Sequence, residues 1–129
     1  MPDPVRAVEF VAGAVTSPGI ADREAKSETE RLAAAAPLDA AVRANNPQIV
    51  YSNQAYKGYG LVEAGRDLRV AYRAVRDARQ PTSDVFTLRA FRVESGQPTV
   101  IDESGPLPVP AVSTPPAQLP SLPGLSPVR

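Results

Sequence analysis

The stretch LRVAYRAVR, residues 68–76, decides the fold class because its apolar side chains recur at every second position. One face of a strand would carry the apolar side chains Leu68, Val70, Tyr72 and Ala74. Arg69 and Arg73 would lie on the opposite face. This alternation predicts a strand with one buried and one solvated face, which is the usual pattern of an antiparallel sheet.

Other short segments with the same period lie on both sides of this strand. Residues 49–52, 58–63 and 85–94 are predicted as strands, and residues 99–102 as a possible further one. The connections are short: residues 65–67 form a tight turn, and residues 77–83 form a longer link that contains Gln80-Pro81. Successive short strands with short links indicate an antiparallel meander.

The N-terminal part is predicted to hold one strand and two helices. Residues 5–11, VRAVEFV, are largely apolar on both faces, as expected of a strand that is covered on both sides. Residues 21–36 are predicted as a helix that Asp22 opens or caps, and a second short helix begins near Pro37 and stops at Asn45-Asn46-Pro47. The predicted fold class is therefore α+β, with two N-terminal helices and an antiparallel β meander.

Composition limits the chain to one small folded unit and a tail. The 129 residues carry a formal net charge of zero and include neither histidine nor cysteine. Residues 105–129 hold eight of the 15 prolines and no acidic residue, so they bury too little apolar surface to fold. We expect a folded unit over residues 1–104 and a proline-rich disordered tail over residues 105–129.

The charge balance and the N-terminal sequence bear on partners and location. A net charge of zero gives no global attraction to nucleic acid or to an acidic membrane. No apolar run approaches the roughly 18 residues of a membrane span. The start Met1-Pro2-Asp3-Pro4 has neither the basic region nor the apolar core of a signal peptide. We therefore expect a cytoplasmic chain without a membrane span and without a nucleic-acid partner.

Two segments in a fixed order resemble a known family. The first is VEFVAGAVTSPG, residues 8–19. The second begins with NPQIVY, residues 46–51, and continues through KGYGLV, residues 57–62, into LRVAYRAV, residues 68–75. Together they resemble the C-terminal part of the PhoD-like alkaline phosphatases (alkaline phosphatase D family), which are metallophosphoesterases. Gln48 stands where the family often has histidine, and the chain lacks the tryptophans that the family often carries in the strand at residues 69–75.

This resemblance implies a role for the chain within a larger protein. Residues 1–104 would be the C-terminal portion of a PhoD-like metallophosphatase domain, and thus a fragment of a four-layer α/β/β/α fold. The family hydrolyses phosphate esters at calcium and iron centres and is commonly exported. Its Gly-Asp-x-His ligand motif comes shortly before the Val-Glu-Phe strand. The implied partner is the missing N-terminal metallophosphatase core, in cis or in trans.

The chain is poor in the ligands that such a centre uses. Phosphoesterase metal ions activate a water molecule and neutralise phosphate charge, and their ligands include histidine nitrogen besides carboxylate oxygen. Without histidine and cysteine, only scattered carboxylates and amides remain. We therefore expect no catalytic residue, no metal ligand and no cofactor in this chain, which should be inactive alone.

The loop of residues 13–19 is the segment that we expect to lie nearest to any chemistry. If the strand before it belongs to the core sheet of the parent enzyme, the hydroxyl groups of Thr16 and Ser17 could contact a phosphate oxygen. The alternative is that small residues only allow a close turn there, with Ser17 closing it before Pro18. We favour this alternative.

A second function from a different class stays open. The chain could be a small non-catalytic α+β module that adds strands to the sheet of a partner. Arginines make the region of the predicted strands locally basic, at positions 66, 69, 73, 76, 79, 89 and 92. A phosphate-attracting surface is one interpretation of them, but the polar face of an ordinary antiparallel sheet is the interpretation that we favour.

Overall fold

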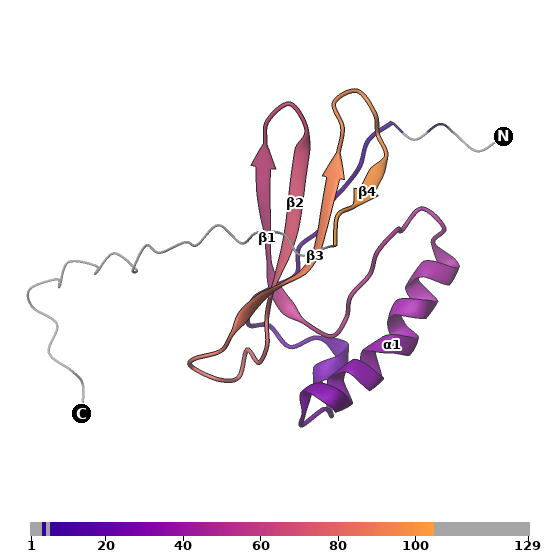
Figure 1. Cartoon of the computed structure of the whole chain (residues 1–129). Helices are drawn as coiled ribbons and strands as arrows, with labels where there is room; N and C mark the ends of the chain where they lie inside the picture. Colours follow the sequence, from indigo (N-terminus) through magenta and orange to yellow (C-terminus); the bar gives the residue numbers. More distant parts are fainter. Residues whose placement is uncertain (1–3, 5, 105–129) are drawn as a thin grey trace, which may run out of the picture.

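The computed structural model describes residue 4 and residues 6–104 (Figure 1). A short 3-10 helix, η1 (Ile20–Asp22), is followed by one long α-helix, α1 (Glu28–Asn45). Four strands come next: β1 (Lys57–Ala64), β2 (Leu68–Val75), β3 (Val85–Val93) and β4 (Val100–Asp102). The tail predicted over residues 105–129 lies outside the described residues.

The four strands form one antiparallel sheet in the order β1-β2-β3-β4, so each strand pairs with its neighbour in sequence. This confirms the predicted α+β class with a β meander. The strand bounds also agree closely with those read from the period-two pattern. Val70 and Ala74 are buried and Arg69 is exposed, so the buried and solvated faces of β2 are those expected from residues 68–76.

A β-bulge between β2 and β3 changes which side chains share a face. Tyr72 pairs with Arg89, but the next residue, Arg73, pairs with Thr87, so Leu88 has no partner in β2. The extra residue brings Phe86 to the same face as Arg89, although strict alternation would put them on opposite faces. An aromatic ring is thereby added to the buried face of the sheet.

The segment before η1 crosses the buried face of the sheet instead of forming a strand. Phe10 packs on Phe91 of β3 with ring centroids 6.1 Å apart, and the backbone carbonyl of Ala14 accepts a hydrogen bond from Gly58 of β1 (3.3 Å). The predicted strand at residues 5–11 is therefore wrong for the described residues 6–11. A strand needs a neighbouring strand to complete its hydrogen bonds, and none of the described segments pairs with it.

A single α-helix replaces the two predicted helices. It begins at Glu28 because Ser27 caps it, accepting a hydrogen bond from the backbone N–H of Glu30 (3.2 Å). It then runs through Pro37, where a break was expected. Proline in a helix interior costs one backbone hydrogen bond, but the alanine-rich sequence around Pro37 favours helix on both sides. Residues 21–27, also predicted as helix, form η1 and a turn.

Residues 49–52, predicted as a strand, connect the helix to the sheet without strand pairing. Polar groups at the end of this segment form hydrogen bonds with a side chain of the helix. The Ser52 hydroxyl and the Gln54 N–H both donate to the carboxylate of Asp39 in α1 (2.7 and 3.2 Å). The backbone N–H of Ile49 donates to Asn46 (2.9 Å), and these contacts hold the segment in place of strand pairing.

The hydrophobic core is small and consists of two parts. The first is formed on the sheet by Val70, Ala74, Ala90 and Phe91, which are at most 3% exposed. Ala21, Ala35 and Ala55 form the second, where η1 and α1 meet the loop before β1. Large apolar side chains stay exposed at the same time: Val11, Val15, Ile20, Leu32, Val50, Tyr59, Leu61, Val62 and Val85. The folded unit thus leaves much of its apolar surface uncovered.

Candidate functional site

The loop that carries Thr16 and Ser17 is held at both of its ends. The carbonyl of Ala14 accepts the hydrogen bond from Gly58, and the backbone N–H of Gly19 donates to the Asp22 carboxylate (2.6 Å). Thr16 and Ser17 are exposed between these two attachments. The structure therefore places the two predicted residues on the surface beside the start of β1, and their contact with a phosphate stays a prediction.

Lys57 is the cation that lies next to this loop. Its ammonium nitrogen is 2.6 Å from the Asp22 carboxylate, and its side chain is 14% exposed. A Cβ built on Gly19 would lie 2.6 Å from that nitrogen, so the absence of a side chain at Gly19 lets Lys57 reach Asp22. Burial raises the pKa of Asp22, but the hydrogen bonds from Lys57 and Gly19 outweigh it and hold the pKa below its usual range.

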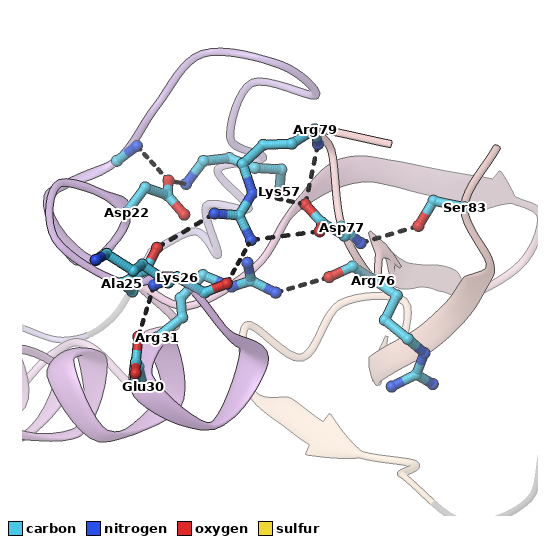
Figure 2. Close-up of polar contacts among 11 residues, drawn as sticks. Asp22, Ala25, Lys26, Glu30, Arg31, Lys57, Arg76, Asp77, Arg79 and Ser83 are labelled. Carbon is cyan, nitrogen blue, oxygen red and sulfur yellow. Dashed lines mark hydrogen bonds and ion pairs between the residues drawn. The ribbon is translucent and has the colours of Figure 1, made fainter. Parts of the chain in front are cut away.

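Further polar contacts join the start of α1 to the link between β2 and β3 (Figure 2). We call this set the polar junction; its members are Asp22, Glu28, Arg31, Lys57, Arg76, Asp77 and Arg79. Arg79 pairs with Asp77 (2.9 Å) and also donates to the backbone carbonyls of Ala25 (3.2 Å) and Lys26. One guanidinium thereby ties the turn before α1 to the loop after β2.

Arg31 is the buried cation of the polar junction. It is 5% exposed, and its Nη2 donates to the backbone carbonyl of Arg76 (2.7 Å). Its guanidinium also lies 5.6 Å from the centre of the Tyr56 ring, within the range of a cation–π interaction. The Tyr56 hydroxyl donates to Glu28 (2.5 Å), which pairs with Arg76 (2.9 Å). The sequence prediction missed Arg31, although it lies one turn before the buried Ala35.

The hydrogen bond between the Tyr56 hydroxyl and the Glu28 carboxylate joins two groups whose pKa values are both shifted. The hydrogen bond from Tyr56, together with Arg76, lowers the pKa of Glu28. Burial and the same hydrogen bond raise the pKa of Tyr56. Both shifts favour a charged carboxylate and a neutral phenol at neutral pH. The polar junction is therefore a set of fixed charges and hydrogen bonds rather than a proton-exchanging pair.

Three arginines of the strands pair with carboxylates, whereas Arg73 donates to the Thr87 hydroxyl. Arg92 contacts Glu103 (2.6 Å), Asp67 (3.4 Å) and Glu94 (2.5 Å), and Arg69 contacts Glu103 (3.6 Å). Arg89 in turn pairs with Asp102 (3.0 Å). The pairs of Arg69 and Arg92 match the interpretation favoured from the sequence, in which arginines form the polar face of the sheet. Arg89 lies on the other face, where its guanidinium is 5.6 Å from the centre of the Tyr51 ring.

Several carboxylates of the described residues already face cations, which makes them poor ligands for calcium or iron. Asp22 is bound by Lys57, Asp77 by Arg79 and Glu103 by Arg92, so their oxygens already face cations. Within residues 4 and 6–104, no cluster of at least three histidine, cysteine or acidic side chains could hold a metal ion. We derive no chemical step through a metal from the residues of this chain.

One shallow hollow lies near these groups. It has a volume of about 350 Å³ and lies between η1 and α1, where Ile20, Arg23, Glu24 and Glu30 contribute to its lining. Its charged lining residues are of both signs, Arg23 against Glu24 and Glu30. In the part of the chain that the structure describes, no helix is both long and apolar enough to cross a membrane.

A function for this chain has to be argued from its own sequence and structure, because comparison with known proteins gives no match. No model of a protein family, no curated protein and no solved structure matches this chain.

Proposed function

We propose that this chain is the C-terminal part of a PhoD-like alkaline phosphatase or phosphodiesterase and that it is inactive by itself. The order of the segments at residues 8–19, 46–62 and 68–75 supports this family. The parent enzyme hydrolyses phosphate esters at a metal centre, and its N-terminal core would supply the metal ligands. The present chain would contribute the sheet, the helix and the loop at Thr16.

The observation that carries the proposal is that the described part of the apolar segment at residues 5–11 is only partly buried, although its sequence pattern predicts burial on both sides. Residues 5–11 are largely apolar on both sides, yet Val11 is 72% exposed, although the neighbouring Phe10 packs on Phe91 of the sheet. Burial of apolar surface stabilises a fold or a complex by about 25 cal/mol of free energy for each Å² removed from water. A neighbouring sheet that supplies this cover is what the missing core would provide, in cis or in trans.

The gene itself gives the first test. The DNA upstream of the Met1 codon should continue in frame, or resume after a frameshift, into a segment that encodes Gly-Asp-x-His. An unrelated upstream sequence, together with a transcript that starts near Met1, would contradict the proposal.

Complementation gives the second test. The N-terminal core of a PhoD-like enzyme, expressed without its own C-terminal part, would be mixed with this chain in the presence of Ca²⁺ and iron. We expect hydrolysis of bis-p-nitrophenyl phosphate in the mixture and not with either component alone. Thr16→Ala in the mixture tests the loop, with Thr29→Ala on the exposed surface of α1 as its control. A loss of rate specific to Thr16→Ala would support contact with the substrate, and equal rates would assign the loop a purely structural role.

The alternative proposal is a non-catalytic α+β module that adds strands to a partner. The exposed edge strand β1 favours it, because an uncovered strand edge is a template for pairing. Thermal unfolding distinguishes the two proposals. A thermal transition of the chain that shifts upward when the N-terminal core is added supports the fragment, and a cooperative transition that the core leaves unchanged supports a self-sufficient module. The cytoplasmic location stays a prediction that cell fractionation would check.

A further inference from the structure

Hydrogen bonds at the two ends of β1 show which of its backbone groups point toward β2 and which point outward, to the free edge of the sheet. The N–H of Gly58 points away from β2, because it donates to Ala14 (3.3 Å). The N–H of Gly65 points inward, because it donates to Asp67 on the returning chain (3.1 Å). Inward and outward residues alternate along an antiparallel strand. The N–H and C=O groups of Gly60 and Val62 therefore point outward.

This edge is apolar and unprotected over most of its length. Tyr59, Leu61 and Val62 are 45%, 46% and 56% exposed, and every residue from Tyr59 to Ala64 is exposed. Among residues 4 and 6–104, the only backbone group that bonds to the outer side of β1 is the carbonyl of Ala14. Edge strands are usually protected by a free lysine, a proline or a bulge. Here Lys57 is held by Asp22, and neither a proline nor a bulge occurs in β1.

We propose that a second copy of this chain pairs antiparallel with β1, about a two-fold axis at Leu61, so that one sheet continues through both copies. In this register Gly60 and Val62 exchange backbone hydrogen bonds with Val62 and Gly60 of the second copy. Leu61 meets Leu61 of the second copy. The proposal rests on the β1 edge alone and requires neither of the functions proposed above.

The side chains of β1 are complementary to themselves in this register. Val62 lies opposite Gly60 of the second copy, where there is room: a Cβ built on Gly60 would meet only the Cβ of Ala12, at 3.6 Å. On the other face, Tyr59 lies opposite Glu63 of the second copy, so a phenol can donate to a carboxylate. Apolar, small and polar side chains each find a suitable partner across the axis.

The two neighbouring registers are less favourable. With an axis at Gly60, the outward pair of Gly60 with Gly60 stays free, but Val62 would face Gly58, whose N–H already donates to Ala14. The axis at Leu61 keeps two free pairs, Gly60 with Val62 and Val62 with Gly60, and blocks only the pairs of Gly58 with Ala64. An axis at Val62 would place Leu61 against Glu63 of the second copy, and thus an apolar side chain against a charge. Shifting by one residue would pair outward with inward backbone groups and lose the hydrogen bonds.

Single cysteines test both the contact and its register, because the natural chain has no cysteine. The full chain would be prepared as Leu61→Cys, Val62→Cys, Glu63→Cys and, on the exposed end of β3, Val85→Cys. Residues on the axis in a non-hydrogen-bonded pair have Cα atoms about 4.5 Å apart, close enough for a disulfide. We expect mild oxidation to link Leu61→Cys into a dimer at least about tenfold faster than the three others, since only its thiols would be within disulfide distance.

A proline variant tests the backbone pairing separately. Val62→Pro removes an outward N–H and leaves the hydrogen bonds to β2 intact, and proline is tolerated at such edge positions. We expect light scattering to show a concentration-dependent dimer for the natural chain and a monomer for Val62→Pro, with circular dichroism confirming the sheet in both. A natural chain that stays monomeric, or cysteines that link at equal rates as in unspecific aggregation, would overturn the proposal. Fastest linkage at Val62→Cys would also overturn it, because the axis would then lie elsewhere.

Discussion

Gly58 of β1 lies where the neighbouring strand β2 leaves no room for a side chain. A Cβ built on it would overlap the carbonyl oxygen of Arg73 in β2, whereas a Cβ on Gly60 would meet only Ala12 at an ordinary contact distance of 3.6 Å. Both glycines belong to the same strand and to the same face. The difference between them therefore comes from the local distance between backbones and not from strand propensity.

This difference leads to a prediction for single substitutions. Gly58→Ala should lower the free energy of unfolding by about 3 kcal/mol, because a strand backbone must move to make room. Gly60→Ala is the matched control and should change the free energy by about 0.5 kcal/mol or less. Urea unfolding followed by circular dichroism measures both. Equal effects of the two substitutions would show that β1 and β2 do not approach as described.

At the scale of elements, side-chain contacts rather than a continuous apolar layer hold the helical part to the sheet. Arg31 of α1 donates to the backbone of Arg76 after β2, and Asp22 of η1 pairs with Lys57 at the start of β1. Figure 1 shows the N-terminal end of α1 near one end of the sheet and its C-terminal end farther from the strands. The attachment of α1 should therefore depend on charge.

Acid should weaken the attachment of η1 to β1. The pKa of Asp22 is lowered in the folded chain, so its stabilisation is complete above the unfolded value of about 3.9 and is lost as the pH falls through the folded value. Asp22→Asn should cost about 1 kcal/mol at pH 7, and the difference from the natural chain should shrink below about pH 4. Urea unfolding at pH 7 and pH 3 measures this difference. Glu24→Gln in the neighbouring turn is the control, and a cost of Asp22→Asn that is the same at both pH values would contradict the prediction.

At the scale of the whole molecule, stability rests on one aromatic cluster. Phe91 is 3% exposed, and its ring centroid lies 6.1 Å from that of Phe10, 5.6 Å from that of Tyr51 and 6.1 Å from that of Tyr72. The rings come from the N-terminal segment, the loop after α1 and two strands. Because most other buried side chains are alanines, few contacts remain if this cluster is lost.

Phe91→Ala should therefore abolish cooperative folding. Truncation of a buried phenylalanine costs about 3–5 kcal/mol, which is close to the whole stability of a domain of this size. Val85→Ala, at a position that is 42% exposed, should keep a cooperative transition within about 1 kcal/mol of the natural chain. Thermal unfolding by near-ultraviolet circular dichroism distinguishes the two. A cooperative transition in Phe91→Ala would place the stabilising contacts elsewhere.

The strands of the meander could be predicted almost to the residue, whereas parts of the candidate site could not. Alternation of apolar and polar side chains is a local signal, and residues 68–76 carry it whatever surrounds them. The surface position of Thr16 and Ser17 and the burial of Arg31 depend on partners far away in the chain: Arg31 and Arg76 are 45 residues apart. The residues next to Arg31 in the sequence give no sign of a partner that far along the chain.

By itself, the sequence determined the α+β class, the strands β1, β2 and β3 with their order along the chain, and the two faces of β2, and it indicated β4 as a possible further strand. Only the tertiary structure decided that residues 6–11 cross the sheet without pairing and that the helix begins at Glu28, capped by Ser27, and continues through Pro37. It also decided that Asp22 binds Lys57 instead of opening a longer helix. The physical reason is that strand periodicity follows from neighbours in sequence, whereas hydrogen-bond partners and cover for apolar faces come from segments that only folding brings together.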